Sequence, residues 1–160
     1  MSYKVDKFLH INSTDNPAEQ TISTTYTEIT GSKCEIKSIN PSPTLMYKFS
    51  FYQSYDRDNS KHSFLNIKLQ KSNDNFSSNI VDIPGQIFTV SGDTQESNDY
   101  YRKTITAFFI IENFDSKYLR LSARLYSSTY SSVLHRSNYY ENTPDPTNIY
   151  YNPTLIVIEL

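Results

Sequence analysis

The sequence predicts an all-β domain, a two-sheet sandwich of the jelly-roll type. Aromatic residues make up 14% of the chain, with 14 Tyr, 9 Phe and no Trp, and such side chains fit the pleated, half-buried surface of a strand. Segments that alternate apolar and polar residues recur between turn residues, whereas no segment has the spacing of an amphipathic helix. We expect about eight to ten short strands, which favours a jelly roll over an immunoglobulin-type sandwich.

The chain is expected to form one jelly-roll domain over residues 1–160. A domain of this size can bury about two-thirds of the surface that its unfolded chain exposes. No internal repeat or long linker divides it. Residues 1–18 are either an N-terminal arm or, through the sequence KFLHI at 7–11, the first strand.

The first strands are predicted between residues 21 and 56. Residues 21–31 (TISTTYTEITG) and 33–39 (KCEIKSI) both alternate with period two, which predicts two strands joined at Gly31. Residues 41–56 (PSPTLMYKFSFYQSYD) start with two prolines and then alternate, so a core strand follows a turn. Its expected inward residues are Leu45, Tyr47, Phe49 and Phe51.

The later strands follow the same pattern. Residues 62–71 (HSFLNIKLQK) and 118–127 (YLRLSARLYS) alternate cleanly, which predicts strands with one buried face. In residues 102–114 (RKTITAFFIIENF), Phe108 and Ile110 make the second face apolar too, so burial on both sides is expected. The remaining predicted strands are residues 131–136 and 153–160.

The sequence contains no recognisable catalytic constellation. The three histidines, His10, His62 and His135, lie far apart and outside any zinc-binding spacing. The only cysteine, Cys34, alternates with Ile36 in a predicted strand, which indicates a small buried thiol rather than a nucleophile. No phosphate-binding loop or nucleophile elbow is present. We therefore expect no enzyme activity, no cofactor and no metal.

Two acidic clusters are the alternatives for a cation site. Both fall in predicted loops, where a solvated turn is the favoured interpretation and weak cation binding the alternative. The clusters are Asp56, Asp58 and His62, and Asp93, Glu96 and Asp99.

The charge and hydropathy of the chain argue against nucleic acid and membranes as partners. A net charge of -2 is not that of a nucleic-acid-binding protein. No segment reaches the ~18 consecutive apolar residues of a membrane span, so no membrane insertion is expected. The N-terminus lacks the pattern of a secretory signal, which predicts a protein made in the cytoplasm of its host cell.

A tyrosine-rich stretch near the C-terminus is the candidate recognition loop. Tyr139, Tyr140, Tyr150 and Tyr151 flank a segment that contains Asp145, and tyrosine offers broad contact area with a polar tip. Exposed, such residues suit protein or sugar recognition. Buried, they form sheet-edge packing or a subunit interface, which is the favoured alternative.

Three stretches together carry a resemblance to a known family. They are a Thr/Ser-rich strand, a second strand, a turn and an apolar strand (21–51), a strand with Tyr and small residues before a variable loop (118–142), and PTLIVIEL (153–160). In this order they resemble small viral and phage structural domains with a tumour-necrosis-factor-like jelly roll. The stretch at 81–103 is less glycine-rich than in typical phage members, and the loop at 138–153 is richer in tyrosine.

The resemblance implies a place for the final strand. In tumour-necrosis-factor-like jelly rolls this strand lies centrally in the inner sheet, close to a three-fold axis. Ile156, Ile158 and Leu160 would then fill the sandwich, whereas Leu155 and Val157 would meet a partner. The expected subunit interface consists of Leu155, Val157, Phe108 and Ile110.

The function implied by the resemblance is that of a virion structural protein. It would be a homotrimeric capsid decoration protein, minor capsid protein or fibre head that contacts other virion proteins and adheres to a host-surface glycan or protein. A free-standing carbohydrate-binding, lectin-like module is the alternative. A cupin-type enzyme would need clustered histidines, which the sequence lacks.

Overall fold

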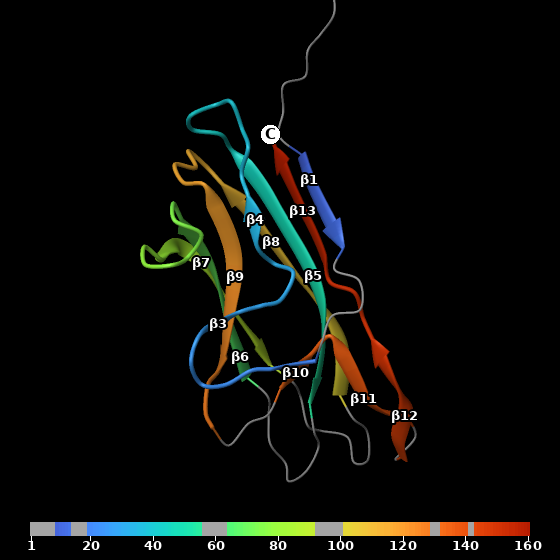
Figure 1. Cartoon of the computed structure of the whole chain (residues 1–160). Coiled ribbons are helices and arrows are strands. Elements are labelled where there is room, and N and C mark those ends of the chain that lie inside the picture. The colour runs from blue at the N-terminus through green and yellow to red at the C-terminus, as the bar shows by residue number, and fades with distance from the viewer. Residues whose placement is uncertain (1–8, 14–18, 56–63, 92–100, 129–131, 141–142) are drawn as a thin grey trace, which may run out of the picture.

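The computed structural model describes residues 9–13, 19–55, 64–91, 101–128, 132–140 and 143–160. Two antiparallel sheets pack against each other, and these segments contain no helix, so the all-β prediction is confirmed as a β-sandwich (Figure 1). The strands are β1 (Leu9–Ser13), β2 (Gln20–Thr21), β3 (Thr27–Glu28), β4 (Cys34–Glu35), β5 (Leu45–Tyr55), β6 (Phe64–Ser72), β7 (Val81–Ser91), β8 (Tyr101–Ile111), β9 (Tyr118–Leu125), β10 (Val133–Leu134), β11 (Arg136–Tyr140), β12 (Thr143–Tyr150) and β13 (Thr154–Glu159).

Sheet A is built around the long strand β5. Its main strands lie in the order β1-β13-β5-β8, and every pair is antiparallel. Strand β8 pairs with β5 along its whole length, from Leu45 opposite Ile111 to Tyr55 opposite Tyr101. On the other edge of β5, β13 pairs with the first half and β10 with Gln53 further along. The final strand is therefore internal to the sheet.

Sheet B is built around strand β6, which pairs with β7 on one edge and β9 on the other. Its order is β9-β6-β7, and β3 and β4 pair with different parts of β9. Along β6 and β9 the predicted inward side chains are buried, which confirms the alternation read from the sequence. These residues are Leu65, Ile67, Leu69, Leu119, Leu121, Ala123 and Leu125.

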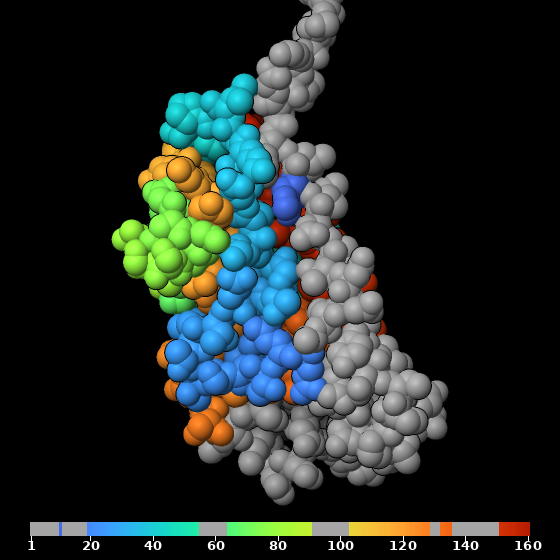
Figure 2. All heavy atoms as spheres, viewed as in Figure 1, coloured from blue at the N-terminus to red at the C-terminus, as the bar shows by residue number. Residues whose placement is uncertain are grey.

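Residues 19–44 close one side of the sandwich. The two strands predicted here are replaced by three strands of two residues each, because the segment passes from β10 in sheet A to β9 in sheet B. Figure 2 shows this segment, in blue to cyan, running along the surface of the molecule. Its residues Ile22 and Ile29 are fully buried. Gly31 has φ 82°, a left-handed conformation that favours glycine at this turn.

The core joins both sheets through hydrogen bonds as well as apolar contacts. The hydroxyl of Tyr47, a fully buried residue of β5, donates to the carbonyl oxygen of Ser32. Ser32 Oγ in turn accepts from the backbone N–H of Leu121 in β9 at 3.1 Å. Burial raises the pKa of Tyr47 above its usual value. It also raises the pKa of Cys34 to about 12, and the thiol is buried, as the sequence predicted.

Two parts of the fold were not predicted as strands. Strand β7 contains Pro84 and Gly85, a pair of residues that is typical of turns. In the structure they lie where the pairing of β6 with β7 is interrupted, and Gly85 has φ 74°. An edge strand can accommodate proline in this way. The other part is the hairpin of β11 and β12, most of which falls in the predicted tyrosine loop at 138–153.

Candidate functional site

The outward face of sheet A has an exposed apolar surface. Phe108 and Ile110 of β8 are 56% and 40% exposed. Met46 of β5 and Ile156 and Ile158 of β13 share this face and are half-buried. We call these five residues the apolar patch. An exposed apolar surface of this kind is typical of a protein interaction site.

The strand register places the patch in two adjacent rows. In the first row, Met46 lies between its cross-strand partners Ile110 and Ile158. In the second row, Lys48 lies between Phe108 and Ile156. Lys48 is exposed, and a lysine can lay its aliphatic stem along an apolar surface while its ammonium group stays in water.

A polar row ends the patch on one side. Ser50 is the cross-strand partner of both Thr106 and Thr154. The hydroxyl oxygens of Ser50 and Thr106 lie 2.9 Å apart in a hydrogen bond. The apolar surface is therefore confined to the end of sheet A where β5 begins and β13 ends.

The predicted orientation of the final strand is wrong. Leu155 and Val157 were expected to meet a partner, but both are fully buried in the sandwich. The register explains this, since Leu155 pairs with Phe49 and Val157 with Tyr47, two inward residues of β5. Their assignment to a subunit interface is corrected accordingly.

The outward residues of β13 are the ones that were expected inside. Ile156 and Ile158 face outward and belong to the apolar patch, and Leu160 is 54% exposed. Glu159 points inward instead, where Ser38 Oγ donates to its Oε2 at 2.8 Å. Both faces of β13 are apolar, so its sequence pattern alone could not distinguish them.

Burial of β8 on both faces, which the sequence predicted, does not hold within this chain. The inward residues Ile105 and Phe109 are buried, whereas Phe108 and Ile110 are exposed. Among the described strands, β8 pairs with β5 alone. The expected role of Phe108 and Ile110 in subunit contact stays a prediction.

The predicted recognition loop is a hairpin in the structure. Tyr139 and Tyr140 belong to β11, and Asp145 and Tyr150 belong to β12. Tyr139 pairs with Pro144, and the register shifts between Ser137 and Tyr139. Figure 1 shows the hairpin at the end of sheet A away from the C-terminus. A recognition role for these residues stays a prediction.

The last of these tyrosines, Tyr151, follows the hairpin. Its ring stacks on that of Tyr52 in β5. The predicted tyrosine loop is thus attached to the central strand of sheet A.

The titratable side chains of the described residues form no metal-binding cluster. No three His, Cys, Asp or Glu side chains come together there in a way that could hold a metal ion. His10 lies in β1, and His135 lies between β10 and β11. The acidic clusters predicted as alternatives lie outside the described residues, as does His62. The same part of the chain contains no helix long and apolar enough to cross a membrane.

Comparisons with known proteins identify no family. No family model matches the chain, and no curated protein matches it. Among solved structures, the dimeric latent form of PorU from Porphyromonas gingivalis is similar, with a TM-score of 0.42 and 10% sequence identity. The similarity covers 96% of this chain and 13% of PorU. Similarity at this level supports no statement about the function of the chain.

Proposed function

We propose that the chain is a non-enzymatic structural subunit that assembles with two further copies of itself through the apolar patch. The observation that carries this proposal is the exposure of Phe108 and Ile110 beside Met46, Ile156 and Ile158 on one sheet face. Burying such side chains against another protein releases roughly 25 cal/mol per Å² of apolar surface removed from water.

A tumour-necrosis-factor-like jelly roll is the fold that we propose within the β-sandwich. The connections support it: the chain leaves sheet A after β5, returns after β7, leaves again after β8 and returns after β9. Antiparallel strands that pass repeatedly between two sheets are characteristic of jelly rolls.

The position of the final strand supports a three-fold assembly. The sequence resemblance implies that this strand lies centrally in the inner sheet, near the three-fold axis. In this chain β13 lies between β1 and β5, and its outward residues Ile156 and Ile158 belong to the apolar patch. Compared with the interface expected from the sequence, the proposed interface still contains Phe108 and Ile110. It contains Ile156 and Ile158 in place of Leu155 and Val157, which are buried.

The same resemblance underlies the proposed setting, which is a virus particle. The subunit would serve as a capsid decoration protein, a minor capsid protein or a fibre head, in contact with other virion proteins. The β11–β12 hairpin lies at the end of sheet A away from the patch. Such a place would leave it available for contact with a host surface.

The mass of the protein in solution tests the assembly. Light scattering during size-exclusion chromatography should give about three times 18.6 kDa for the unaltered chain. The Phe108→Glu variant should elute as a monomer, because three carboxylates would enter an apolar interface at a cost of several kcal/mol.

A matched control comes from the same strand. Thr104→Glu introduces the same charge on the same face of β8, at an exposed position outside the patch. It should stay trimeric. A monomeric unaltered chain, or trimers that tolerate Phe108→Glu, would contradict the proposal.

A further inference from the structure

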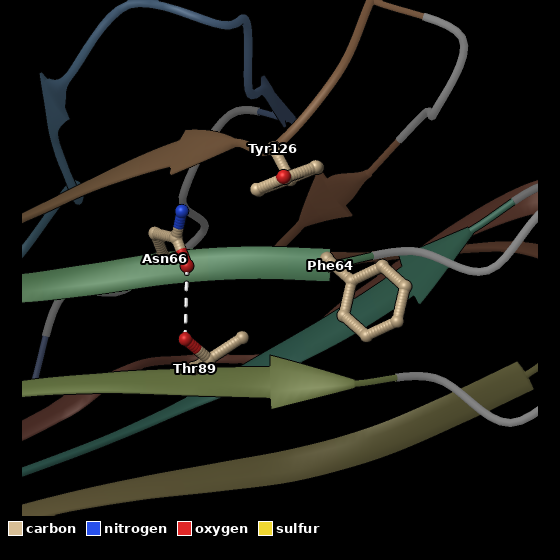
Figure 3. A pocket seen from close by; sticks show the side chains of 4 residues that line it. All are labelled: Phe64, Asn66, Thr89 and Tyr126. Carbon is tan, nitrogen blue, oxygen red and sulfur yellow. Dashed lines mark hydrogen bonds between the residues drawn. The ribbon is translucent and has the colours of Figure 1, made fainter.

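An aromatic pocket lies on the outward face of sheet B. It has a volume of about 290 Å³ and is lined by Phe64, Asn66, Thr89 and Tyr126. Figure 3 shows these four side chains around a common hollow, with Phe64 and Asn66 on β6, Thr89 on β7 and Tyr126 just after β9. None of the four was predicted as a site residue.

Strand pairing brings these residues together. Asn66 lies opposite Thr89 in the β6–β7 pair. The backbone N–H of Tyr126 donates to the carbonyl oxygen of Phe64 at 3.1 Å, which fixes the end of β9 beside the start of β6. The two rings meet edge to face, with centroids 6.5 Å apart and an interplanar angle of 67°. The pocket therefore has two apolar walls set at a steep angle.

The polar side of the pocket is ordered by one hydrogen bond. Thr89 Oγ1 donates to Asn66 Oδ1 at 2.9 Å (Figure 3). This bond fixes the amide so that the two N–H donors of Asn66 Nδ2 remain, and no hydrogen bond occupies them within the described residues. Thr89 Oγ1 keeps its acceptor capacity. A ligand with neighbouring hydroxyl groups could donate one hydrogen bond to Thr89 Oγ1 and accept another from Asn66 Nδ2.

Among the described residues, two charged side chains occupy strand positions beside Asn66. Lys68 Nζ lies 2.7 Å from Asp82 Oδ2. The guanidinium of Arg124, the cross-strand neighbour of Asn66, lies 4.9 Å from the ring centroid of Tyr26. The four lining residues themselves are all uncharged. An uncharged lining suits a neutral ligand.

We propose that this pocket binds a single neutral sugar ring. One face of a pyranose presents C–H groups, which pack on an aromatic ring, and its rim presents hydroxyls that hydrogen-bond to an amide and a hydroxyl. Tyr126 is 71% exposed and so offers its ring as an open platform. The volume is at the lower end for small-molecule sites, roughly 300 to 1,000 Å³, which suits one ring rather than a long glycan segment.

The proposal does not rest on the assembly proposed above. The pocket lies on the outward face of sheet B, whereas the apolar patch lies on the outward face of sheet A. Loss of either property leaves the surface of the other unchanged, so the two proposals fail separately.

Saturation-transfer NMR on the full chain tests the site. The probes are glucose, galactose, mannose and N-acetylglucosamine, with glucuronate as the anionic comparison. At least one neutral sugar should receive magnetisation from the protein, and glucuronate should receive less. For the best sugar, Tyr126→Ala should weaken binding by about tenfold or more, the loss expected when a central aromatic contact is removed. Tyr126→Phe keeps the ring and should lose less.

Tyr151→Ala is the matched control, because it removes another exposed tyrosine that belongs to the predicted tyrosine loop. It should bind the sugar as the unaltered chain does. No transfer to any neutral sugar would overturn the proposal. So would binding that survives Tyr126→Ala, or that is lost in Tyr151→Ala instead.

Discussion

The ring of Tyr52 lies face to face with the ring of Tyr151. The centroids are 3.9 Å apart and the planes differ by 15°. Tyr52 belongs to the central strand of sheet A, and Tyr151 connects the β11–β12 hairpin to β13. The backbone N–H of Tyr151 also donates to the carbonyl oxygen of His135 at 2.8 Å. The stack therefore joins the hairpin to the body of the sandwich.

Replacing Tyr151 should loosen this connection. Tyr151→Ala is expected to lower the free energy of unfolding by about 1 kcal/mol, the usual contribution of an aromatic pair beyond its buried area. Tyr151→Leu keeps apolar bulk without the ring and separates burial from stacking. Urea denaturation followed by tyrosine fluorescence measures both. Equal stability of Tyr151→Ala and the unaltered chain would show that the stack contributes nothing.

The buried hydroxyl of Tyr47 should stabilise the contact between the sheets. Tyr47→Phe keeps the ring but leaves the carbonyl oxygen of Ser32 without its donor. An unsatisfied buried polar group costs about 1 to 3 kcal/mol, so the thermal midpoint should fall. Tyr118→Phe is a useful comparison, because Tyr118 is only half-buried. A larger loss in Tyr118→Phe than in Tyr47→Phe would contradict this expectation.

His135 is a fully buried residue with φ 67°, and its ring lies edge-on to that of Phe51. Within the described residues, neither ring nitrogen has a hydrogen-bond partner. Burial lowers the pKa of His135 to about 4. The folded chain therefore keeps this imidazole neutral at a pH where the unfolded chain protonates it.

Stability should consequently fall as the pH falls through the window from 6.5 to 4. Above 6.5 the imidazole is neutral in both states, whereas below it the unfolded state binds the proton first. The expected loss is about 3 kcal/mol, since one pKa unit corresponds to about 1.4 kcal/mol. His135→Asn keeps a residue that tolerates positive φ and should lose this contribution. Urea midpoints from pH 4 to 7 test it; identical pH profiles for both proteins would refute it.

How much the sequence could predict depended on whether a strand has one apolar face or two. In β6 and β9 only one face is apolar: Ile67 and Leu121 are aliphatic, whereas Lys68 and Arg120 beside them are charged. The orientation of these strands therefore followed directly from the sequence. In β13 each face carries aliphatic residues, and only the pairing of Val157 with an inward residue of β5 decides which face is buried. Pairing between distant strands is not visible in a local pattern.

The short strands and the pocket depended on tertiary structure in the same way. Strands β2, β3 and β4 are short because the chain crosses from sheet A to sheet B between Thr21 and Thr27. Ile22 and Ile29 are both buried, although strict alternation would place them on opposite faces. Phe64 and Tyr126 are far apart in sequence and meet only through the pairing of β6 with β9. Aromatic residues are common in this chain, so neither stood out in advance.

The place of β13 between β1 and β5 affects the order in which the protein can fold. Strands β6, β7 and β9 all lie between residues 64 and 125, so the main part of sheet B can form from a contiguous stretch during synthesis. Strand β1 pairs with β13, so its partner in sheet A is missing until residues 154–159 have been made. Contacts between such distant residues carry a large loop-closure entropy and form slowly. Completion of sheet A should therefore be a slow event that follows the synthesis of residues 154–159.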